Sequence, residues 1–354
     1  MKKKKNIRKK VIAAVVVCIA VLIFVYCIPT LGLVKGSTVL DSSYEETIIN
    51  DASGHKMVSP YAFMVNTLYR TANIIIGSQE NPLMNEDNAA KETVPFEPVI
   101  KNSYRIDKAD FNGCEGEKVS PSDANGQYVL YIHGGGFSSG SAKERRDITT
   151  YLASEYGFTV YANDYRLAPQ VGLPEMQEDC LNFYLGILES GVNPENIIVM
   201  GDSAGAHLSL TLGLILRDRA LPQPKAIGCF SPVVEFVEQY PSRTANVSTD
   251  FMLGNSINHM NWKEIFGCES EELTDPYMSP IRGDFTDVAP VFIAVSDYET
   301  PFDDSCKLYQ KLKDEGHQTE LNIQHGLVHA YVIFGTMKET QVSISHFMSF
   351  INNE

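Results

Sequence analysis

The chain of 354 residues is acidic, with 44 Asp and Glu against 29 Lys and Arg and a formal net charge of −15 at pH 7. Seven of these cations and no acid lie in residues 1–34, so the remainder has 22 basic groups (29 less 7) against 44 acidic ones, a net charge of −22 (22 less 44). Such a body is unsuited to nucleic acid and to anionic lipid surfaces, which repel it. We therefore expect neutral or cationic partners and no nucleic acid.

The N-terminus combines a basic stretch, residues 1–10, with an uninterrupted apolar segment, residues 11–28. That segment is about as long as a bilayer-spanning helix, and a basic flank stays in the cytoplasm. No A-x-A-like cleavage site follows it. We predict a cytoplasmic tail over residues 1–10 and a transmembrane signal anchor over residues 11–34, which makes this a single-pass protein of the cell membrane with its body outside the cytoplasm. A cleaved signal and a secreted protein are the alternative.

The remaining length fits one large α/β domain, residues 101–354, with a linker and cap region, residues 35–100. Apolar residues at helical spacing from Tyr61 to Ile75 predict an amphipathic helix in that region, followed by a polar loop. The cysteines of the body are scattered and form no C-x-x-C pair, so neither a zinc site nor a disulfide framework is expected, although a single disulfide stays open. We expect no metal and no cofactor.

An aromatic and β-branched strand, residues 127–132, runs into His133 and three consecutive glycines. Such glycines let the backbone approach a ligand and point N–H groups at it, which suits a site that stabilises an oxyanion. We expect the N–H groups of Gly134 and Gly135 to form an oxyanion hole with that of Ala204. His133 is expected to order the loop rather than to carry a proton.

The sequence Gly201-Asp202-Ser203-Ala204-Gly205 follows a short apolar strand and precedes a helix rich in leucine. This pattern is typical of a nucleophile elbow, a tight strand-to-helix turn that leaves the serine hydroxyl exposed above the sheet. The flanking glycines are needed because a side chain there would collide with the neighbouring elements. Ser203 is therefore the candidate nucleophile.

Strands and helices alternate through the rest of the domain. Strands are predicted over residues 158–163, 197–200, 226–231, 290–295 and 320–324, and helices over residues 144–156, 174–188 and 341–351. Residues 118–126 read as a surface loop. This alternation predicts an α/β fold with a doubly wound, mostly parallel sheet that binds ligands beyond the carboxyl ends of its strands.

A serine nucleophile needs a histidine base and an orienting carboxylate, and on this kind of sheet they follow the serine in the order acid, then histidine. His325 and His329 lie in the loop after the last predicted strand, where the base belongs. The acid must follow residues 290–295, where four carboxylates compete: Asp297, Glu299, Asp303 and Asp304.

The motifs at residues 133–137, 165–169 and 201–205, in this order and spacing, resemble those of the hormone-sensitive-lipase-like esterases, also called the α/β-hydrolase fold-3 group. The resemblance implies an α/β-hydrolase fold with an N-terminal helical cap, to which residues 61–75 would belong. It makes His329 the base, with His325 as the runner-up. The family's D-P-L-x-D pattern, laid with its second aspartate on Asp303, makes Glu299 the acid, with Asp297 as the runner-up.

This set of residues favours a serine ester hydrolase that cleaves short-chain acyl esters through an acyl-enzyme, with Phe137 expected to narrow the substrate pocket. A membrane-anchored acyltransferase or deacetylase acting on cell-envelope glycans would use the same residues and is the alternative. A non-catalytic binding module of the same fold is disfavoured because the set is complete.

Overall fold

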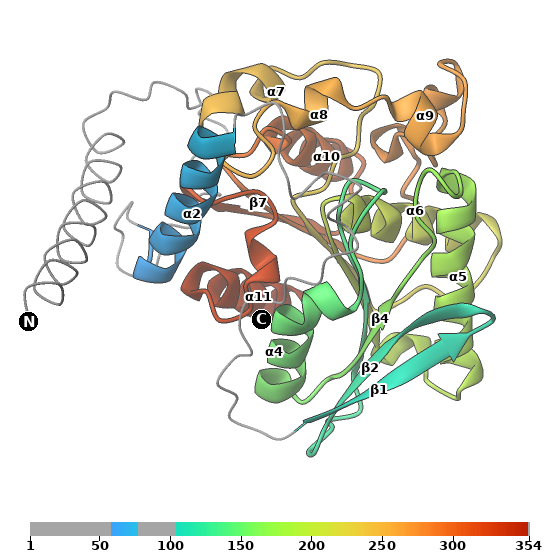
Figure 1. Ribbon diagram of the computed structural model, residues 1–354. Helices are drawn as coiled ribbons and strands as arrows, with labels where there is room; N and C mark the ends of the chain where they lie inside the picture. Colours follow the sequence, from blue (N-terminus) through green and yellow to red (C-terminus); the bar gives the residue numbers. More distant parts are fainter. Residues whose placement is uncertain (1–57, 77–103, 353–354) are drawn as a thin grey trace, which may run out of the picture.

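The computed structural model describes residues 58–76 and 104–352. An eight-stranded sheet with the order β1-β2-β4-β3-β5-β6-β7-β8 runs through the centre of the molecule (Figure 1). Its strands are β1 (Tyr104–Phe111), β2 (Cys114–Pro121), β3 (Tyr128–Ile132), β4 (Thr159–Asn163), β5 (Ile197–Asp202), β6 (Ala226–Phe230), β7 (Val291–Ser296) and β8 (Thr319–Gln324).

Helices connect and cover these strands. The α-helices are α2 (Pro60–Ile76), α4 (Arg146–Tyr156), α5 (Leu173–Glu189), α6 (Ala204–Asp218), α7 (Ser242–Ala245), α8 (Ser256–His259), α9 (Trp262–Phe266), α10 (Phe302–Asp314) and α11 (Lys338–Asn352). Short 3-10 turns are η2 (Lys143–Arg145), η3 (Pro194–Asn196), η4 (Asn246–Ser248), η5 (Glu272–Thr274), η6 (Pro280–Arg282) and η7 (Tyr331–Ile333).

The two faces of the sheet are covered by different helices, because alternate strand residues point to opposite sides. On β3, Leu130 and Ile132 join the apolar core beneath α5 and α6, whereas Val129 and Tyr131 join the core beneath α4 and α11. Helix α10 packs on the same face as α6, over β6, β7 and β8. The sheet is therefore buried on both sides, as a doubly wound fold requires.

From β4 onward all neighbouring strands are parallel, so their carboxyl ends meet at one edge. In the registers of the pairs, Asp202 lies beside Phe230, and Ser296 lies beside Gln324. The loops that follow β5, β6, β7 and β8 consequently emerge side by side. This edge gathers every loop in which the sequence places a candidate site residue after Ser203.

Helix α2 confirms the amphipathic helix predicted over residues 61–75, and it lies against the loop that follows β8 (Figure 1). Ala62 and Val65 pack on residues 327–337, and the Asn66 amide donates to the carbonyl of Gly326 at 2.7 Å. At its start, the Ser59 hydroxyl bonds to Glu339 of α11 at 2.7 Å. The helix thus holds the loop that carries His329.

A second covering segment lies between β6 and β7 and contains α7, α8 and α9 (Figure 1). Its aromatic side chains Phe236 and Phe266 contact Phe137, which follows the glycines of the loop after β3. This insert was not assigned to any element by the sequence pattern, because its helices have only four or five residues each.

The edge hairpin differs from the sequence prediction. Residues 118–121 belong to β2 instead of a surface loop, and β1 and β2 pair antiparallel through the two-residue turn Asn112-Gly113. Both turn residues have positive φ angles, 56° and 84°, as the type of turn that matches the twist of a hairpin needs.

No helix within residues 58–76 and 104–352 is long and apolar enough to cross a membrane. The predicted anchor, residues 11–34, the tail that precedes it and most of the linker lie outside the described residues. The five cysteines of the described residues are free thiols.

The first turn of α6 packs directly on the backbone at the end of β3. A Cβ at Gly205 would lie 2.0 Å from the carbonyl oxygen of Ile132, whereas one at Gly213, in the same helix, would lie 2.7 Å from Ile227 Cδ1 and 2.9 Å from Val288 Cγ1, which are side-chain atoms and not backbone. We expect Gly205→Ala to lower the free energy of unfolding by about 1–3 kcal/mol or more, because strand backbone cannot move aside cheaply. Urea unfolding of the purified variants measures this.

Gly213→Ala is the matched control. Alanine has a helix propensity about 1 kcal/mol better than glycine, which offsets part of the cost of moving the Ile227 and Val288 side chains, so this variant should lose less stability than Gly205→Ala. Equal losses in the two variants would contradict the steric origin of the Gly205 requirement.

Candidate active site

Ser203 occupies the turn between β5 and α6 with φ 54° and ψ −119°, a conformation that L-residues rarely adopt. The flanking glycines permit it: a Cβ at Gly201 would lie 2.3 Å from the carbonyl oxygen of Gly205. The Ser203 N–H is held by the carbonyl of Phe230 at 2.8 Å. The structure therefore builds the predicted elbow geometry around this serine.

His329 and Glu299 complete a hydrogen-bonded chain with Ser203. The Nε2 atom of His329 lies 2.8 Å from the Ser203 hydroxyl oxygen, and its Nδ1 atom lies 2.7 Å from a carboxylate oxygen of Glu299. All three side chains are buried. This is the geometry in which an imidazole can take the serine proton while a carboxylate fixes the tautomer of its ring.

The Glu299 carboxylate has further donors. The Ser231 hydroxyl donates to Oε1 at 2.9 Å, and the N–H of Ser296 donates to the same oxygen at 2.7 Å. Burial raises the pKa of Glu299, and its bonds to His329 and to the Ser296 N–H oppose this rise. Burial also disfavours the charged form of His329, yet Glu299, joined by Asp250 and Asp202, raises the pKa of His329 above the ordinary value.

The runner-up residues, Asp297 and His325, contact each other. His325 Nδ1 lies 2.6 Å from an oxygen of Asp297, whose other oxygen accepts the N–H of Gly326 at 2.9 Å. The side chains of His325 and Asp297 are 33% and 11% exposed. The structure thus separates two histidine–carboxylate pairs, and only His329 and Glu299 reach Ser203.

A buried ion pair between Arg145 and Asp202 fixes the residue that directly precedes Ser203. The guanidinium of Arg145 grips Asp202 through Nε at 2.8 Å and Nη2 at 3.0 Å, and the Tyr131 hydroxyl donates to Asp202 at 3.0 Å. Although burial raises the pKa of Asp202, Arg145 outweighs it and lowers this pKa below the ordinary value. Asp202 is therefore held as a carboxylate directly before the nucleophile.

The glycine loop places its N–H groups differently from the sequence prediction. The N–H of Gly134 bonds to the Asp202 carboxylate and is not free to hold an oxyanion. The N–H groups of Gly135, Gly136 and Ala204 have no acceptor in the part of the chain that the structure describes. Gly135 and Gly136 have φ angles of 127° and 61°, so the loop turns sharply here. The free donors therefore begin one residue later than predicted.

His133 orders this loop, in agreement with its expected part. Its ring stacks on Tyr165 with 4.3 Å between ring centroids, and its Nδ1 bonds to the carbonyl of Gly134 at 2.8 Å. Burial and the nearby Arg145 lower the pKa of His133 to about 4. The imidazole is thus neutral at pH 7.

Phe137 does not line an open pocket. Its side chain is 1% exposed and lies edge-on against His207, Phe236, Trp262 and Phe266. It supports the aromatic side chains of the insert instead of offering a surface to substrate. The sequence prediction assigned it to substrate binding because the folded position of the insert could not be read from the chain.

Several supporting residues were missed by the sequence reasoning. Arg145, Tyr131 and Ser231 come from three different segments and carry no local motif.

No group of three or more His, Cys, Asp or Glu that could hold a metal occurs among the described residues.

Comparison with known proteins agrees with this geometry. A family model described as alpha/beta hydrolase fold matches residues 129–333, more than half of the chain. An acetyl-hydrolase of Streptomyces hygroscopicus is 32% identical over 198 residues, which are 56% of this chain and 65% of that protein, less than two thirds of its length.

Solved structures extend the similarity over the whole domain. EstE5, in a crystal soaked by p-nitrophenyl butyrate, superposes with a TM-score of 0.72 at 26% identity and covers 83% of this chain and 98% of its own. An esterase from the bacterial hormone-sensitive lipase family gives a TM-score of 0.72 at 25% identity, with 84% and 99% covered. The chain therefore belongs to the α/β-hydrolase fold family, in its hormone-sensitive-lipase-like group.

Proposed function

We propose that this protein is a serine ester hydrolase that cleaves short-chain acyl esters through an acyl-enzyme. The observation that carries the proposal is the continuous hydrogen-bonded chain from Glu299 through His329 to Ser203, with distances of 2.7 and 2.8 Å. A serine hydroxyl is a weak nucleophile until such a base takes its proton.

In the first half-reaction, the Ser203 oxygen attacks the ester carbonyl while its proton passes to Nε2 of His329. The tetrahedral oxyanion lies against the N–H groups of Gly135, Gly136 and Ala204, whose donors are fixed before the charge develops. His329 then gives its proton to the departing alcohol, and the acyl group stays on Ser203. Water repeats the sequence with His329 as base, which releases the acid and restores the hydroxyl.

Glu299 stabilises the imidazolium that forms in both half-reactions. Its negative charge lies 2.7 Å from Nδ1 in a buried setting, where charges interact more strongly than in water. The raised pKa of His329 expresses the same attraction. Activity therefore needs neutral His329, and it is lost as the pH falls through this raised pKa.

Two observations support a short acyl group. The similar proteins include one named acetyl-hydrolase and one whose crystal was soaked by p-nitrophenyl butyrate. In addition, the aromatic cluster around Phe137 fills the space between the glycine loop and α9 with protein. A long acyl chain would have to displace these rings.

We also propose that residues 11–34 anchor the enzyme in the cell membrane, with the hydrolase domain outside the cytoplasm. The support is the sequence alone: an apolar segment of bilayer length preceded by seven cations. The alternative is cleavage of this segment and secretion.

Fractionation of cells that express the full chain tests the anchor. We expect the full chain in the membrane fraction after a carbonate wash, and external protease should remove the hydrolase domain from intact cells. A matched chain without residues 1–35 should stay soluble in the cytoplasm. If cells that express the full chain instead release a product shortened at its N-terminus into the medium, that result would favour secretion.

A series of p-nitrophenyl esters from acetate to decanoate tests the reaction and the acyl preference. We expect kcat/KM to be highest from acetyl to butyryl and to fall steeply by octanoyl, because a filled pocket cannot bury the extra methylenes, each worth about 0.8 kcal/mol when buried. Ser203→Ala should abolish turnover. A maximum at decanoyl or longer would contradict the short-acyl preference, and acyl transfer to added sugars that outruns hydrolysis would favour the acyltransferase.

The two carboxylate–histidine pairs are separated by substitution. Glu299→Gln should lower kcat by orders of magnitude, up to about 10⁴-fold, because the amide favours the wrong imidazole tautomer. The acid limb of kcat/KM, which should lie above the ordinary histidine pKa of about 6.5 in the wild type, should move to lower pH in this variant.

Asp297→Asn is the control, since Asp297 contacts His325 and not His329. It should leave kcat within a few fold of the wild type. A larger loss in Asp297→Asn than in Glu299→Gln would show that the pairs have exchanged roles.

A further inference from the structure

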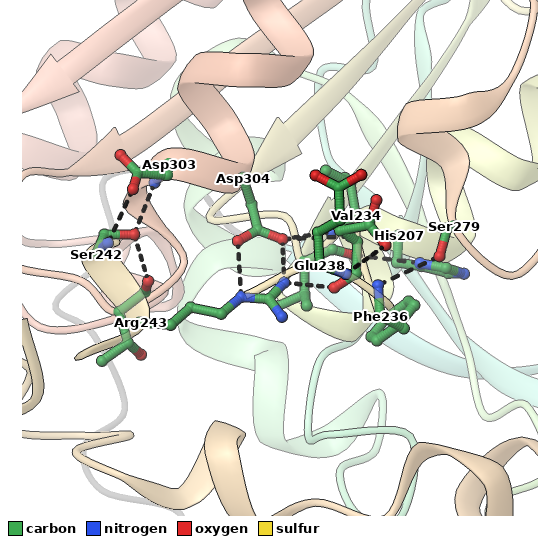
Figure 2. Close-up of polar contacts among 12 residues, drawn as sticks. His207, Val234, Phe236, Glu238, Ser242, Arg243, Ser279, Asp303 and Asp304 are labelled. Carbon is green, nitrogen blue, oxygen red and sulfur yellow. Dashed lines mark hydrogen bonds and ion pairs between the residues drawn. The ribbon is translucent and has the colours of Figure 1, made fainter. Parts of the chain in front are cut away.

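Residues 242–250 of the insert, called here the clamp segment, run along the loop that carries Glu299. At its first end the segment is fixed to α10, as Figure 2 shows: the Ser242 N–H donates to Asp303 at 2.8 Å, and Arg243 Nε donates to Asp304 at 3.1 Å. Arg243 and Asp304 are both buried. Paired charges of this kind are costly to separate, so the start of the segment is firmly placed.

The middle of the clamp segment bonds to the backbone carbonyls of Glu299 and of the two residues before it. The Asn246 amide donates to the carbonyl of Asp297 at 3.0 Å and to that of Glu299 at 2.8 Å. The Thr249 hydroxyl shares its one proton between the carbonyl of Asn246 at 3.0 Å and that of Tyr298, which lies between Asp297 and Glu299, at 3.1 Å. Three successive carbonyls of the acid loop are thus held by side chains from one segment.

The far end of the clamp segment holds the next residue, Thr300. The Asp250 carboxylate accepts the Thr300 N–H at 2.8 Å and the Thr300 hydroxyl at 3.0 Å, and its other oxygen accepts the N–H of Leu253 at 2.9 Å. Asp250 is buried. All these contacts come from donors, so the side chain acts as an acceptor only, as a carboxylate does.

This chain departs from the D-P-L-x-D pattern at the residues that the clamp segment grips. Thr300 stands where that pattern has proline, which has no N–H to donate, and Glu299 is one methylene longer than the aspartate. The longer side chain has one more rotatable bond, whose freedom is lost when the carboxylate is held against His329. A backbone fixed by the clamp segment limits the positions that this carboxylate can take.

We infer that Asn246 and Asp250 are positioning residues for the proposed reaction, which set the backbone of the Glu299 loop so that its carboxylate meets His329. The inference rests on the proposed function, because it assigns these residues to the triad. Asp250 has a second effect through its charge. Together with Glu299 and Asp202 it raises the pKa of His329.

The test follows phosphonylation of Ser203 by a p-nitrophenyl phosphonate. Its rate reports the reactivity of Ser203, His329 and Glu299 without turnover of a carboxylic ester. Rates are measured from pH 5 to pH 9 for the full chain and its variants. Asn246→Ala should lower the plateau rate about tenfold or more. Asp250→Asn should lower the plateau and also move the acid limb to lower pH, because a negative charge near His329 is removed.

Coupling to Glu299 separates positioning from mere stability. In a Glu299→Gln background, Asn246→Ala should have no further effect on the phosphonylation rate, since the carboxylate it positions is gone. Gln177→Ala is the matched control: its amide also donates to a carbonyl of the insert, that of Tyr277 at 2.7 Å, but it touches neither the clamp segment nor the loop that carries Glu299. This variant should react like the wild type.

Thr300→Val keeps the side-chain shape and removes the hydroxyl donor to Asp250, so it tests the same clamp from the loop side if Asn246→Ala fails to fold. We expect a several-fold lower plateau rate. Wild-type rates in Asn246→Ala, Asp250→Asn and Thr300→Val, or a full effect of Asn246→Ala in the Glu299→Gln background, would overturn the inference. Variants that lower phosphonylation as expected in an enzyme that turns over no ester would overturn the proposed function alone.

Discussion

The buried carboxylate of Glu299 is the group on which the rest of the site depends. A charge taken out of water must be matched by donors, and here they come from Ser231 after β6, Ser296 at the end of β7 and His329 after β8. The sheet order makes this possible, because β6, β7 and β8 are neighbours and parallel, so their carboxyl ends open side by side. The fold thus places the hydrogen-bond donors around the Glu299 carboxylate before substrate binds.

Two buried carboxylates with opposite surroundings divide the work of the site. The charge of Asp202 is balanced by that of Arg145, and its lowered pKa keeps the carboxylate ionised. Asp202 thus joins the Gly134 N–H to the elbow and takes no part in proton transfer. Among the contacts of Glu299 within residues 58–76 and 104–352, the only group that can become a cation is His329, so its charge is balanced when that imidazole is protonated. The two environments shift the pKa values of the two acids in opposite directions, and this difference assigns their roles. Asp202 is structural, whereas Glu299 stabilises a charge that appears during the reaction.

Sequence reasoning reached those parts of the site that depend on local backbone geometry. The elbow around Ser203 and the strand before the glycines are short-range patterns, and the structure forms both. It missed the N–H of Gly134, because the acceptor of that group, Asp202, lies on another strand. It also missed β1 and β2, although the Asn112-Gly113 pair between them is a strong hairpin signal. The short helices of the insert have no periodicity to detect, so the burial of Phe137 could not be foreseen.

The competition between Asp297 and Glu299, which no local pattern settles, is resolved by the way two loops cross. Asp297 pairs with His325 and Glu299 with His329, so the same two loops are joined by both pairs. The Ser296 hydroxyl adds a third link by accepting the N–H of Leu327 at 2.9 Å. The pair of Asp297 and His325 is partly exposed, and such pairs contribute only about 0–1 kcal/mol. Sliding either loop by one residue would break both pairs at once, so the two pairs share one register of the two loops.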